Sequence, residues 1–188
     1  MANLTVKEKS LKSYEMLKGK FGYKNTMAAP RLLKIVVSSG TGNAMKKNKN
    51  HNELVADRLT KITGQKTALK GAKQSIATFK IRQGDPVGVS VTLRGPRMFG
   101  FAEKFFNIAV PRTKDFRGFN RSAVDNIGNL TLGIKEHVIF PETADEDIKD
   151  VFGLSVTLVS SAKTKEEGMA FFELIGVPFK KVDDVKKK

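Results

Sequence analysis

The 188-residue sequence predicts an α+β fold, in which helices pack on one face of an antiparallel β-sheet. Helix signals with recognisable caps alternate along the chain with short strand signals. Residues 87–94 alternate apolar and polar side chains with the period of two expected of a strand with one buried face. The length and the 40% of apolar residues suit one globular domain, which we expect over residues 1–179, followed by a basic, mobile tail at 180–188.

Four helices are expected from their caps and apolar spacing. Thr5 and Glu8 have the spacing of a capping box, which predicts a helix that begins there and continues to about Phe21. The signals of the other three helices are Leu54, Val55, Leu59 and Ile62 before Gly64; Pro96, Met98, Phe101, Phe105 and Ile108 before Pro111; and Thr164 and Glu167 at the start of a segment that ends at Gly176.

Strands are expected where short apolar runs are bounded by turn residues. Residues 79–82 and 87–94 flank a Gly-Asp-Pro turn and are predicted to pair as a hairpin. The other expected strands are 32–37, 131–134, 138–140 and 154–159, with a basic-polar loop at 46–50 and a long loop at 111–130.

The strand at 87–94 raises the question of what covers its polar face. Its apolar residues are expected to face the core, so the opposite face ends in Thr92 and Arg94, with Arg97 just beyond a Gly-Pro turn. Exposed strand residues are common, so these residues alone leave open both a solvated face and a binding face.

The distribution of charge favours a polyanionic partner. The formal net charge is +15, and residues 1–121 contain 25 basic and 7 acidic side chains, whereas residues 122–188 contain 9 basic and 12 acidic ones. All eight arginines lie at or before Arg121. Because guanidinium groups bind phosphate bidentately, this asymmetry indicates a nucleic-acid-binding surface.

The sequence lacks the residue groups that catalysis requires. His51 and His137 have no partner at ligand spacing and are interpreted as ordinary polar residues. Gly40 and Gly42 fit a turn rather than a dinucleotide fingerprint or a P-loop. The acidic stretch 142–150 lacks EF-hand spacing, which favours a solvated or partner-facing patch over a metal site. We therefore expect no catalytic residue, no metal and no cofactor.

Nothing in the sequence indicates a membrane protein or a secreted one. There is no run of about 18 apolar residues, no apolar centre of a signal peptide and no helix that pairs a lysine-rich face with a large apolar one. The absence of cysteine fits a reducing cytosol. We expect a soluble, cytosolic protein that has no membrane partner.

Two basic segments are further candidates for binding. In AVPRTKDFRGFNRS, Phe116 and Phe119 either stack on unpaired bases or anchor the loop in the core, and both interpretations stay open. In KGAKQSIATFKIRQGDPVG, the alternatives are an arm that reaches nucleic acid and a solvated strand edge protected by charge. The basic residues are Arg112, Lys114, Arg117 and Arg121 in the first segment, and Lys70, Lys73, Lys80 and Arg82 in the second.

Longer motifs carry a resemblance to a known family. MAAPRLLKIVV, ITGQK, FKIRQGDPVGVSVTLRGPRMFGF, NIAVPRTKDFRGFN, GNLTLGIKEHVIFPE and SAKTKEEGMAFFELIGVPF follow one another along the chain. In this order, over about residues 25–179, they resemble the bacterial large-subunit ribosomal protein L five family. Several long motifs in the correct order make a chance resemblance improbable.

The resemblance implies a non-catalytic protein of the cytoplasmic ribosome. Such a protein attaches 5S rRNA to the central protuberance of the large subunit, where 23S rRNA and neighbouring proteins are its partners, and is a monomer there. The resemblance also implies contact with peptidyl-site (P-site) tRNA and a bridge to protein S thirteen of the small-subunit head. It implies that the open sheet face is held against RNA, with Thr92 meeting 2′-hydroxyls or phosphates and Arg94 a phosphate or a base edge.

Carried over by position, the resemblance assigns residues of this chain to three surfaces. The basic-aromatic loop is a fourth candidate. The four sets of residues are as follows. They are Ser38, Gln65, Lys66, Thr92, Arg94 and Arg97 toward 5S rRNA; Lys73, Gln74, Ser75, Thr78 and Lys80 toward tRNA; Glu142, Asp145, Glu146 and Asp147 toward the bridge; and Arg112, Lys114, Phe116 and Arg117 in the basic-aromatic loop.

Three departures from the family's pattern limit this transfer. Ser38 and Ser39 stand where the family commonly has Asn-Met, so an amide contact to RNA becomes a shorter hydroxyl contact. The tRNA-side loop usually has paired basic residues and a glycine, whereas this chain has Lys73, Gln74 and Thr78. Residues 124–130 are VDNIGNL where Phe-Asp-Gly-Arg-Gly-Asn-Tyr is expected, which removes an arginine and both aromatic residues.

Three alternatives belong to other functional classes. A free RNA-binding factor explains the charge but not the match along the chain, and stoichiometric sedimentation with large subunits would exclude it. A nucleic-acid-processing enzyme requires a clustered acidic metal site and turnover that depends on magnesium. A membrane-surface protein would float with liposomes.

Overall fold

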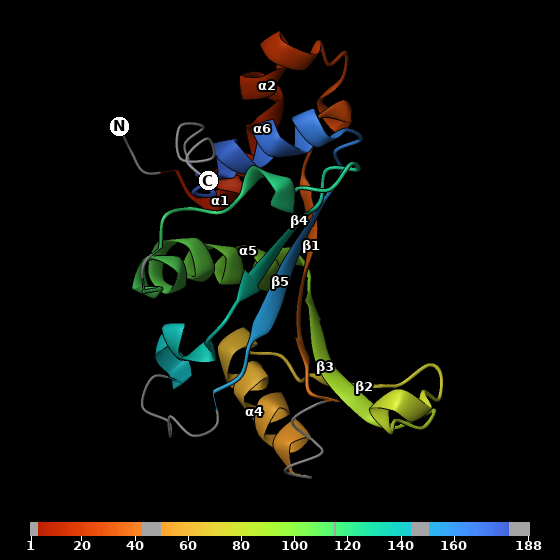
Figure 1. Ribbon diagram of the computed structural model, residues 1–188. Helices are drawn as coiled ribbons and strands as arrows, with labels where there is room; N and C mark the ends of the chain where they lie inside the picture. The colour runs from red at the N-terminus through yellow and green to blue at the C-terminus, as the bar shows by residue number, and fades with distance from the viewer. Residues whose placement is uncertain (1–3, 43–49, 115, 144–150, 181–188) are drawn as a thin grey trace. The chain divides into compact units, whose positions relative to one another are not determined.

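The computed structural model describes residues 4–42, 50–114, 116–143 and 151–180. Over these residues the fold is α+β, as predicted, with five α-helices and a five-stranded antiparallel sheet (Figure 1). The strand order is β2-β3-β1-β5-β4. The strands are β1 (Leu32–Gly40), β2 (Ala68–Gly71), β3 (Pro86–Leu93), β4 (Leu130–Ile134) and β5 (Leu154–Ser160); the helices are α1 (Val6–Leu11), α2 (Ser13–Phe21), α4 (His51–Thr63), α5 (Gly95–Lys104) and α6 (Lys165–Ile175).

The chain forms two compact units. Unit 1 comprises Met1–Ile35, Arg94–Leu132 and Thr157–Lys188, and unit 2 comprises Val36–Leu93 and Gly133–Val156. Strands β1, β4 and β5 each contribute one part to each unit, so both units contain strands as well as helices. The single domain expected over residues 1–179 stays a prediction.

The N-terminal helix of unit 1 begins as the sequence predicts. The Thr5 hydroxyl accepts a hydrogen bond from the Glu8 backbone N–H (3.2 Å), and the Thr5 N–H donates to the Glu8 carboxylate (2.9 Å). These bonds lower the pKa of the Glu8 carboxyl, the Thr5 backbone donor being the main cause. The single helix expected up to Phe21 is interrupted at Lys12, whose ψ of 3° lies far from the helical value of about −42°.

Helix α5 carries the predicted apolar stripe, except at its end. Met98, Phe101 and Phe105 are buried, and the Phe101 and Phe105 rings stack with their centroids 6.0 Å apart. Ile108, the last residue of the predicted stripe, is 46% exposed and lies off the buried face. The backbone over Phe105–Ala109 forms a wider π-helical turn, which rotates position 108 off the stripe.

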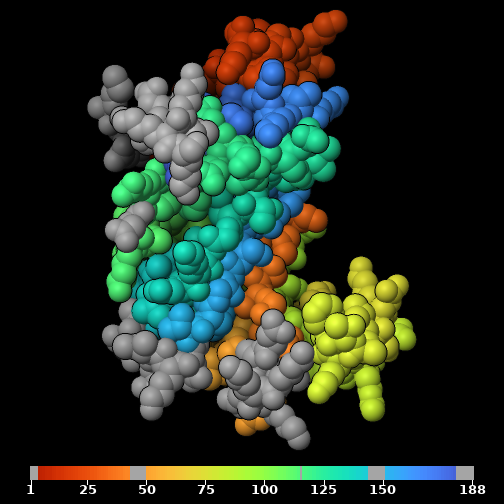
Figure 2. All heavy atoms as spheres, in the orientation of Figure 1, coloured from red at the N-terminus to blue at the C-terminus, as the bar shows by residue number. Residues whose placement is uncertain are grey.

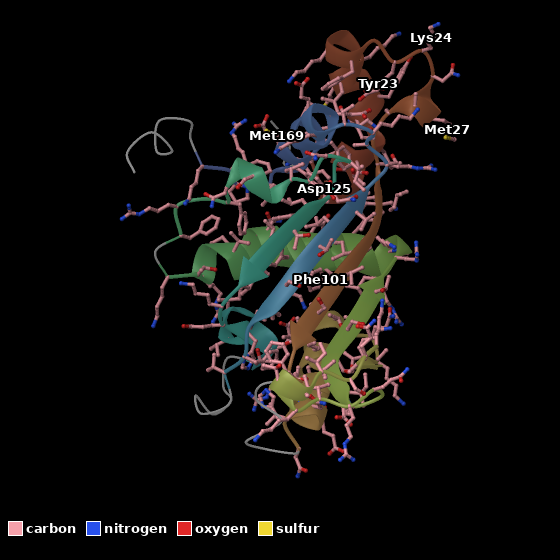
Figure 3. All side chains as sticks on the ribbon, turned by 45° about the vertical axis from the view of Figure 1, so that its right-hand side comes forward. Tyr23, Lys24, Met27, Phe101, Asp125 and Met169 are labelled. Atoms are coloured by element: carbon pink, nitrogen blue, oxygen red, sulfur yellow. The ribbon has the colours of Figure 1, made fainter. Side chains whose placement is uncertain are left out.

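The long loop expected at 111–130 is irregular but well anchored in unit 1. The Ser160 hydroxyl donates to the Gly128 carbonyl (2.6 Å), and the Asn129 backbone N–H donates to the Asp125 carboxylate (2.6 Å). Gly128 has φ +79° and lies directly against Gly168 of α6. In Figure 3, the loop that carries Asp125 lies beside the helix that carries Met169.

Helix α6 is tied to the segment after α2 by a buried carboxylate. Thr164 caps the helix as predicted by accepting a hydrogen bond from the Glu167 N–H, and the helix ends at Gly176. The Glu167 side chain accepts from the Tyr23 hydroxyl (2.5 Å) and from the Lys163 N–H (2.7 Å). Glu167 is only 7% exposed, whereas Lys24 and Met27, which follow Tyr23, are exposed (Figure 3).

In unit 2, helix α4 packs on β2 and β3 and ends at Gly64, as predicted. The predicted hairpin partner of β3 is wrong. That partner is β2, with Ala68 opposite Ser90 and Leu69 opposite Val89, whereas residues 79–82 belong to the connection between these strands. The backbone of this connection forms its hydrogen bonds within itself, in a 3-10 turn at Ala77–Phe79 and a bridge between Ile76 and Ile81. It therefore does not pair with β3.

The strand predicted at 138–140 is also wrong. Residues His137–Ile139 form a 3-10 turn, after which Phe140 is fully buried. The His137 N–H donates to the Phe152 carbonyl (3.1 Å), and the Phe140 N–H donates back to the His137 carbonyl (3.1 Å). Turn formation therefore satisfies the backbone groups that a strand would have paired with a neighbour.

The contact between the loop and α6 predicts an effect of side-chain size. A Cβ atom on Gly168 would lie 2.5 Å from the Gly128 Cα, so Gly168→Ala is expected to lower the free energy of unfolding by about 1–3 kcal/mol. Gly100→Ala in α5 is the matched control, because its Cβ would meet nothing within 4 Å and alanine favours a helix by about 0.5–1 kcal/mol. Urea unfolding of both variants measures these effects, and an unchanged midpoint for Gly168→Ala would contradict the close contact.

The bond between Tyr23 and Glu167 predicts a dependence of stability on pH. Burial, together with the hydrogen bond to Glu167, raises the pKa of Tyr23 above its ordinary value of 10.0. Because the folded state holds this proton more tightly, the stabilisation is complete below pH 10 and is lost as the pH rises through the raised pKa. Tyr23→Phe is expected to cost about 1–2 kcal/mol at pH 7. Denaturant titrations of both proteins between pH 7 and 11 should show the difference shrinking above pH 10; a constant difference would exclude this linkage.

Candidate nucleic-acid interface

Unit 2 presents a polar face of the sheet built from alternating side chains. On β3, Val91 and Leu93 are buried while Thr92 between them is exposed. The same alternation on β1 and β5 places Ser38 and Ser155 on the side away from the buried valines. We call Ser38, Ser90, Thr92 and Ser155 the polar sheet face. Small hydroxyl side chains leave the strand backbones accessible to a large partner.

The structure brings two predicted RNA contacts together. Gly64 ends α4 with φ +66°, and the Thr63 hydroxyl, which donates to the Leu59 carbonyl (2.6 Å), lies 3.2 Å from the Gln65 carbonyl in the turn that follows. The Gln65 side chain then donates from Nε2 to the Thr92 carbonyl (3.1 Å). Gln65 and Thr92 therefore occupy one edge of the polar sheet face, and the exposed Lys66 follows directly in sequence.

Ser38 has a partner that sequence reasoning missed. Its hydroxyl shares a hydrogen bond of 2.9 Å with the hydroxyl of Ser155, on the neighbouring strand β5. A hydroxyl has one donor and two acceptor sites, so each serine retains capacity for a further bond. The one signal in the sequence that points to Ser155 is the alternation of apolar and polar residues along β5, which places it on the polar side.

Arg94 and Arg97 belong to unit 1 and lie at the start of α5. Arg94 is the N-cap residue, with extended backbone and no capping bond from its side chain, and Arg97 lies in the first turn. Both side chains are exposed, and within the described residues neither forms an ion pair. Their charges are therefore available to an external anion.

Residues 72–85, which we call the arm, connect β2 to β3. All five residues predicted toward tRNA, Lys73, Gln74, Ser75, Thr78 and Lys80, lie on it and are exposed. The Ser75 hydroxyl also accepts a hydrogen bond from the Gln83 N–H (2.9 Å), so its role includes holding the arm together. Figures 1 and 2 show the arm, in yellow, standing out from α4 and β1 of its own unit.

The basic-aromatic loop is partly folded onto unit 1. Phe116 and Phe119 are half-buried and contact each other edge to face, with their ring centroids 5.0 Å apart. The Phe119 N–H donates to the Pro178 carbonyl (2.8 Å), and the Lys180 N–H donates to the Phe119 carbonyl (2.9 Å). The cations Arg112, Lys114 and Arg117 are exposed. The rings are therefore not fully buried in the core, and their stacking on unpaired bases stays a prediction.

The acidic residues predicted at the bridge fall only partly within the described chain. Glu142 is exposed on a 3-10 turn, Pro141–Thr143, whereas Asp145, Glu146 and Asp147 lie outside the described residues. Over the described residues, no three His, Asp or Glu side chains gather as metal ligands would. None of the described helices is long and apolar enough to span a bilayer.

His137 has a structural role that its sequence context did not reveal. It is fully buried, its ring stacks on Phe152 at 4.2 Å, and its Nε2 lies 3.2 Å from Nη1 of the buried Arg58. The pair ties α4 to the turn after β4 and leaves this imidazole inaccessible to a substrate.

Comparisons with known proteins show the family of the chain. The family model described as ribosomal protein L5 matches residues 25–82, and a second model, described as the C-terminus of the same ribosomal family, matches residues 86–179. The protein named large ribosomal subunit protein uL5 of Ureaplasma parvum serovar 3 is 48% identical over 166 residues, which cover 88% of this chain and 90% of that protein.

Two further relatives have the same name. That of Thermoanaerobacter sp. is 49% identical over 162 residues, which cover 86% of this chain and 90% of the relative. That of Desulfatibacillum aliphaticivorans is 48% identical over 165 residues, which cover 88% and 92% respectively. A ribosomal structural protein is not an enzyme, so the prediction of a non-catalytic chain is confirmed. Both family models and these relatives show that the chain belongs to the ribosomal protein L5 family.

Proposed function

We propose that this chain is a structural protein of the large ribosomal subunit, in the cytoplasm, that holds 5S rRNA against the polar sheet face of unit 2. Family membership places it among large-subunit proteins of the translation machinery. The observation that carries the 5S proposal is the side-by-side position of Gln65 and Thr92, joined by a hydrogen bond of 3.1 Å on an open polar face.

The chemistry of this face suits RNA in particular. Hydroxyl and amide side chains on adjacent strands can bond to 2′-hydroxyl groups and phosphates, and only the former distinguish RNA from DNA. Lys66 on unit 2 and Arg94 and Arg97 on unit 1 are exposed cations that neutralise phosphate. Polar contacts thus fix the register of the RNA while the cations supply most of the affinity.

The remaining partners follow from the resemblance and from the position of the residues. The exposed arm, with Lys73, Gln74, Thr78 and Lys80, faces P-site tRNA. Glu142 and the acidic stretch that follows it bridge to protein S thirteen of the small-subunit head. In the central protuberance the chain is a monomer, in contact with 23S rRNA and neighbouring proteins.

Replacing Arg94 tests the cationic part of this proposal. Arg94→Ala is expected to weaken binding of the purified chain to 5S rRNA by about 1–3 kcal/mol, the range for a charge-assisted contact. Lys18→Ala, an exposed cation on α2, is the matched control and should change the affinity little. Filter binding over a salt series, with an unrelated structured RNA alongside, measures both variants. If both RNAs bind equally and Arg94→Ala changes neither affinity, the binding depends only on the general positive charge of the chain, which would contradict the proposed 5S contact.

Replacing Thr92 tests the polar sheet face itself. Thr92→Val keeps the β-branched shape and the carbonyl that Gln65 contacts, but it removes the exposed hydroxyl. Affinity for 5S rRNA is expected to fall by about 1 kcal/mol with little change in the salt slope, because no charge is lost. Ser122→Ala, which removes an exposed hydroxyl from unit 1, should bind as the wild type does. The same salt series reads out both variants, and undiminished affinity of Thr92→Val would place the RNA elsewhere.

A further inference from the structure

The tip of the arm exposes two large apolar side chains. Phe79 is 53% exposed and Ile76 is 44% exposed, whereas Phe105, Phe140 and Phe171 are each at most 1% exposed in the cores of the two units. Phe79 and Ile76 lie at either end of a single short turn, because the Phe79 N–H donates to the Ile76 carbonyl (3.2 Å). Phe79 and Ile76 are therefore exposed together on a protruding turn, where they add no core packing and are accessible to a partner.

The arm holds this turn in a defined conformation. Ile76 and Ile81 form a two-way backbone bridge (3.0 and 3.3 Å), and Lys80 is held in the left-handed region with φ +53°. At the base of the arm, Ala72 bonds through both its N–H and its carbonyl to the 84–85 backbone (2.8 and 3.0 Å). Because these hydrogen bonds already fix the backbone of the turn, the Phe79 ring loses little conformational entropy on binding.

The surroundings of the ring favour an anionic partner. Lys73, Lys80 and Arg82 are exposed on the arm, and the only acid there is Asp85. The Asp85 carboxylate accepts a hydrogen bond from the Arg82 backbone N–H (2.7 Å), so it is used to close the loop. An apolar ring rimmed by cations suits RNA better than an apolar protein groove, which would leave the three charges desolvated without partners.

We infer that Phe79, supported by Ile76, stacks on an unpaired base of a folded RNA, so that the arm recognises exposed bases and not phosphate alone. Phosphate contacts need only the cations, whereas a ring gains stacking energy only where a base face is uncovered. In a duplex, both faces of each base are covered by its neighbours. This inference deepens the proposed contact of the arm with tRNA and rests on it, but the residues that carry it are distinct from the polar sheet face.

The test uses the full chain bound to 5S rRNA, so that the sheet face is occupied, and the free chain in parallel. Two labelled probes are titrated by fluorescence anisotropy: an RNA stem-loop with about seven unpaired nucleotides, and a duplex of the same length. Phe79→Ala is expected to weaken stem-loop binding about 5- to 150-fold, the range for one aromatic–base stack, and to leave the weaker duplex binding unchanged. Phe79→Tyr retains the ring and should bind within about twofold of the wild type.

Leu69→Ala is the matched control, because Leu69 lies on β2, outside the arm, and is 54% exposed. It should change neither probe's affinity, and unaltered 5S binding by Phe79→Ala shows that the variant is folded. Equal binding of stem-loop and duplex by the wild type, or a Phe79→Ala variant that binds as the wild type does, would overturn the inference. If the wild type fails to take up 5S rRNA, the proposed function is wrong, and the free-chain titration still decides whether Phe79 stacks.

Discussion

In unit 2, helix α4 packs against β2 and β3, and this contact determines which side of the strands is buried. Val55 and Leu59 of the helix and Val89 and Val91 of β3 are all at most 3% exposed. Burying each such side chain contributes about 1.5–3 kcal/mol. Because strand side chains alternate, a slip of one residue would exchange the valines for the polar residues between them. The packing of α4 therefore also fixes Thr92 on the open side.

Two kinds of chemistry are separated within unit 2. The polar sheet face has small hydroxyl groups, with the amide of Gln65 at its edge, which suit a close approach to ribose and phosphate. The arm has an exposed ring and long cationic side chains on a braced turn. The polar sheet face spans neighbouring strands, whereas the arm is the connection between β2 and β3, which local hydrogen bonds close. The polar sheet face and the arm thus contact RNA through different residues, so substitutions in one need not alter the other.

The parts of the fold that follow from local chemistry were predictable. The cap at Thr5, the glycine end of α4 at Gly64 and the alternation in β3 each depend on residues close in sequence. The β2–β3 pairing was missed because Ala68–Gly71 is exposed along its length and lacks an apolar pattern. Ile108 was misplaced because one π-helical turn changes the period from which burial is inferred.

The candidate site was predictable to a similar extent. Gln65 and Thr92 were assigned from the resemblance, but their hydrogen bond joins residues 27 positions apart and depends on the packing of α4. Phe79 was assigned to a strand but also lies in the segment for which an arm was one of two interpretations, so the sequence left its exposure open. The pair formed by Arg58 and His137 lies 79 positions apart, beyond any spacing rule.

The division of the chain between the two units has a consequence for the order of folding. Every segment of unit 2 has been synthesised once the chain reaches Val156, whereas the core of unit 1 requires Phe171, Phe172 and Ile175 of α6. The backbone bonds from Phe119 to residues 178 and 180 come later still. During synthesis, α1 and α2 therefore cannot complete their packing until α6 has been made. The surface proposed to hold 5S rRNA has by then been fully synthesised, while unit 1 is still incomplete.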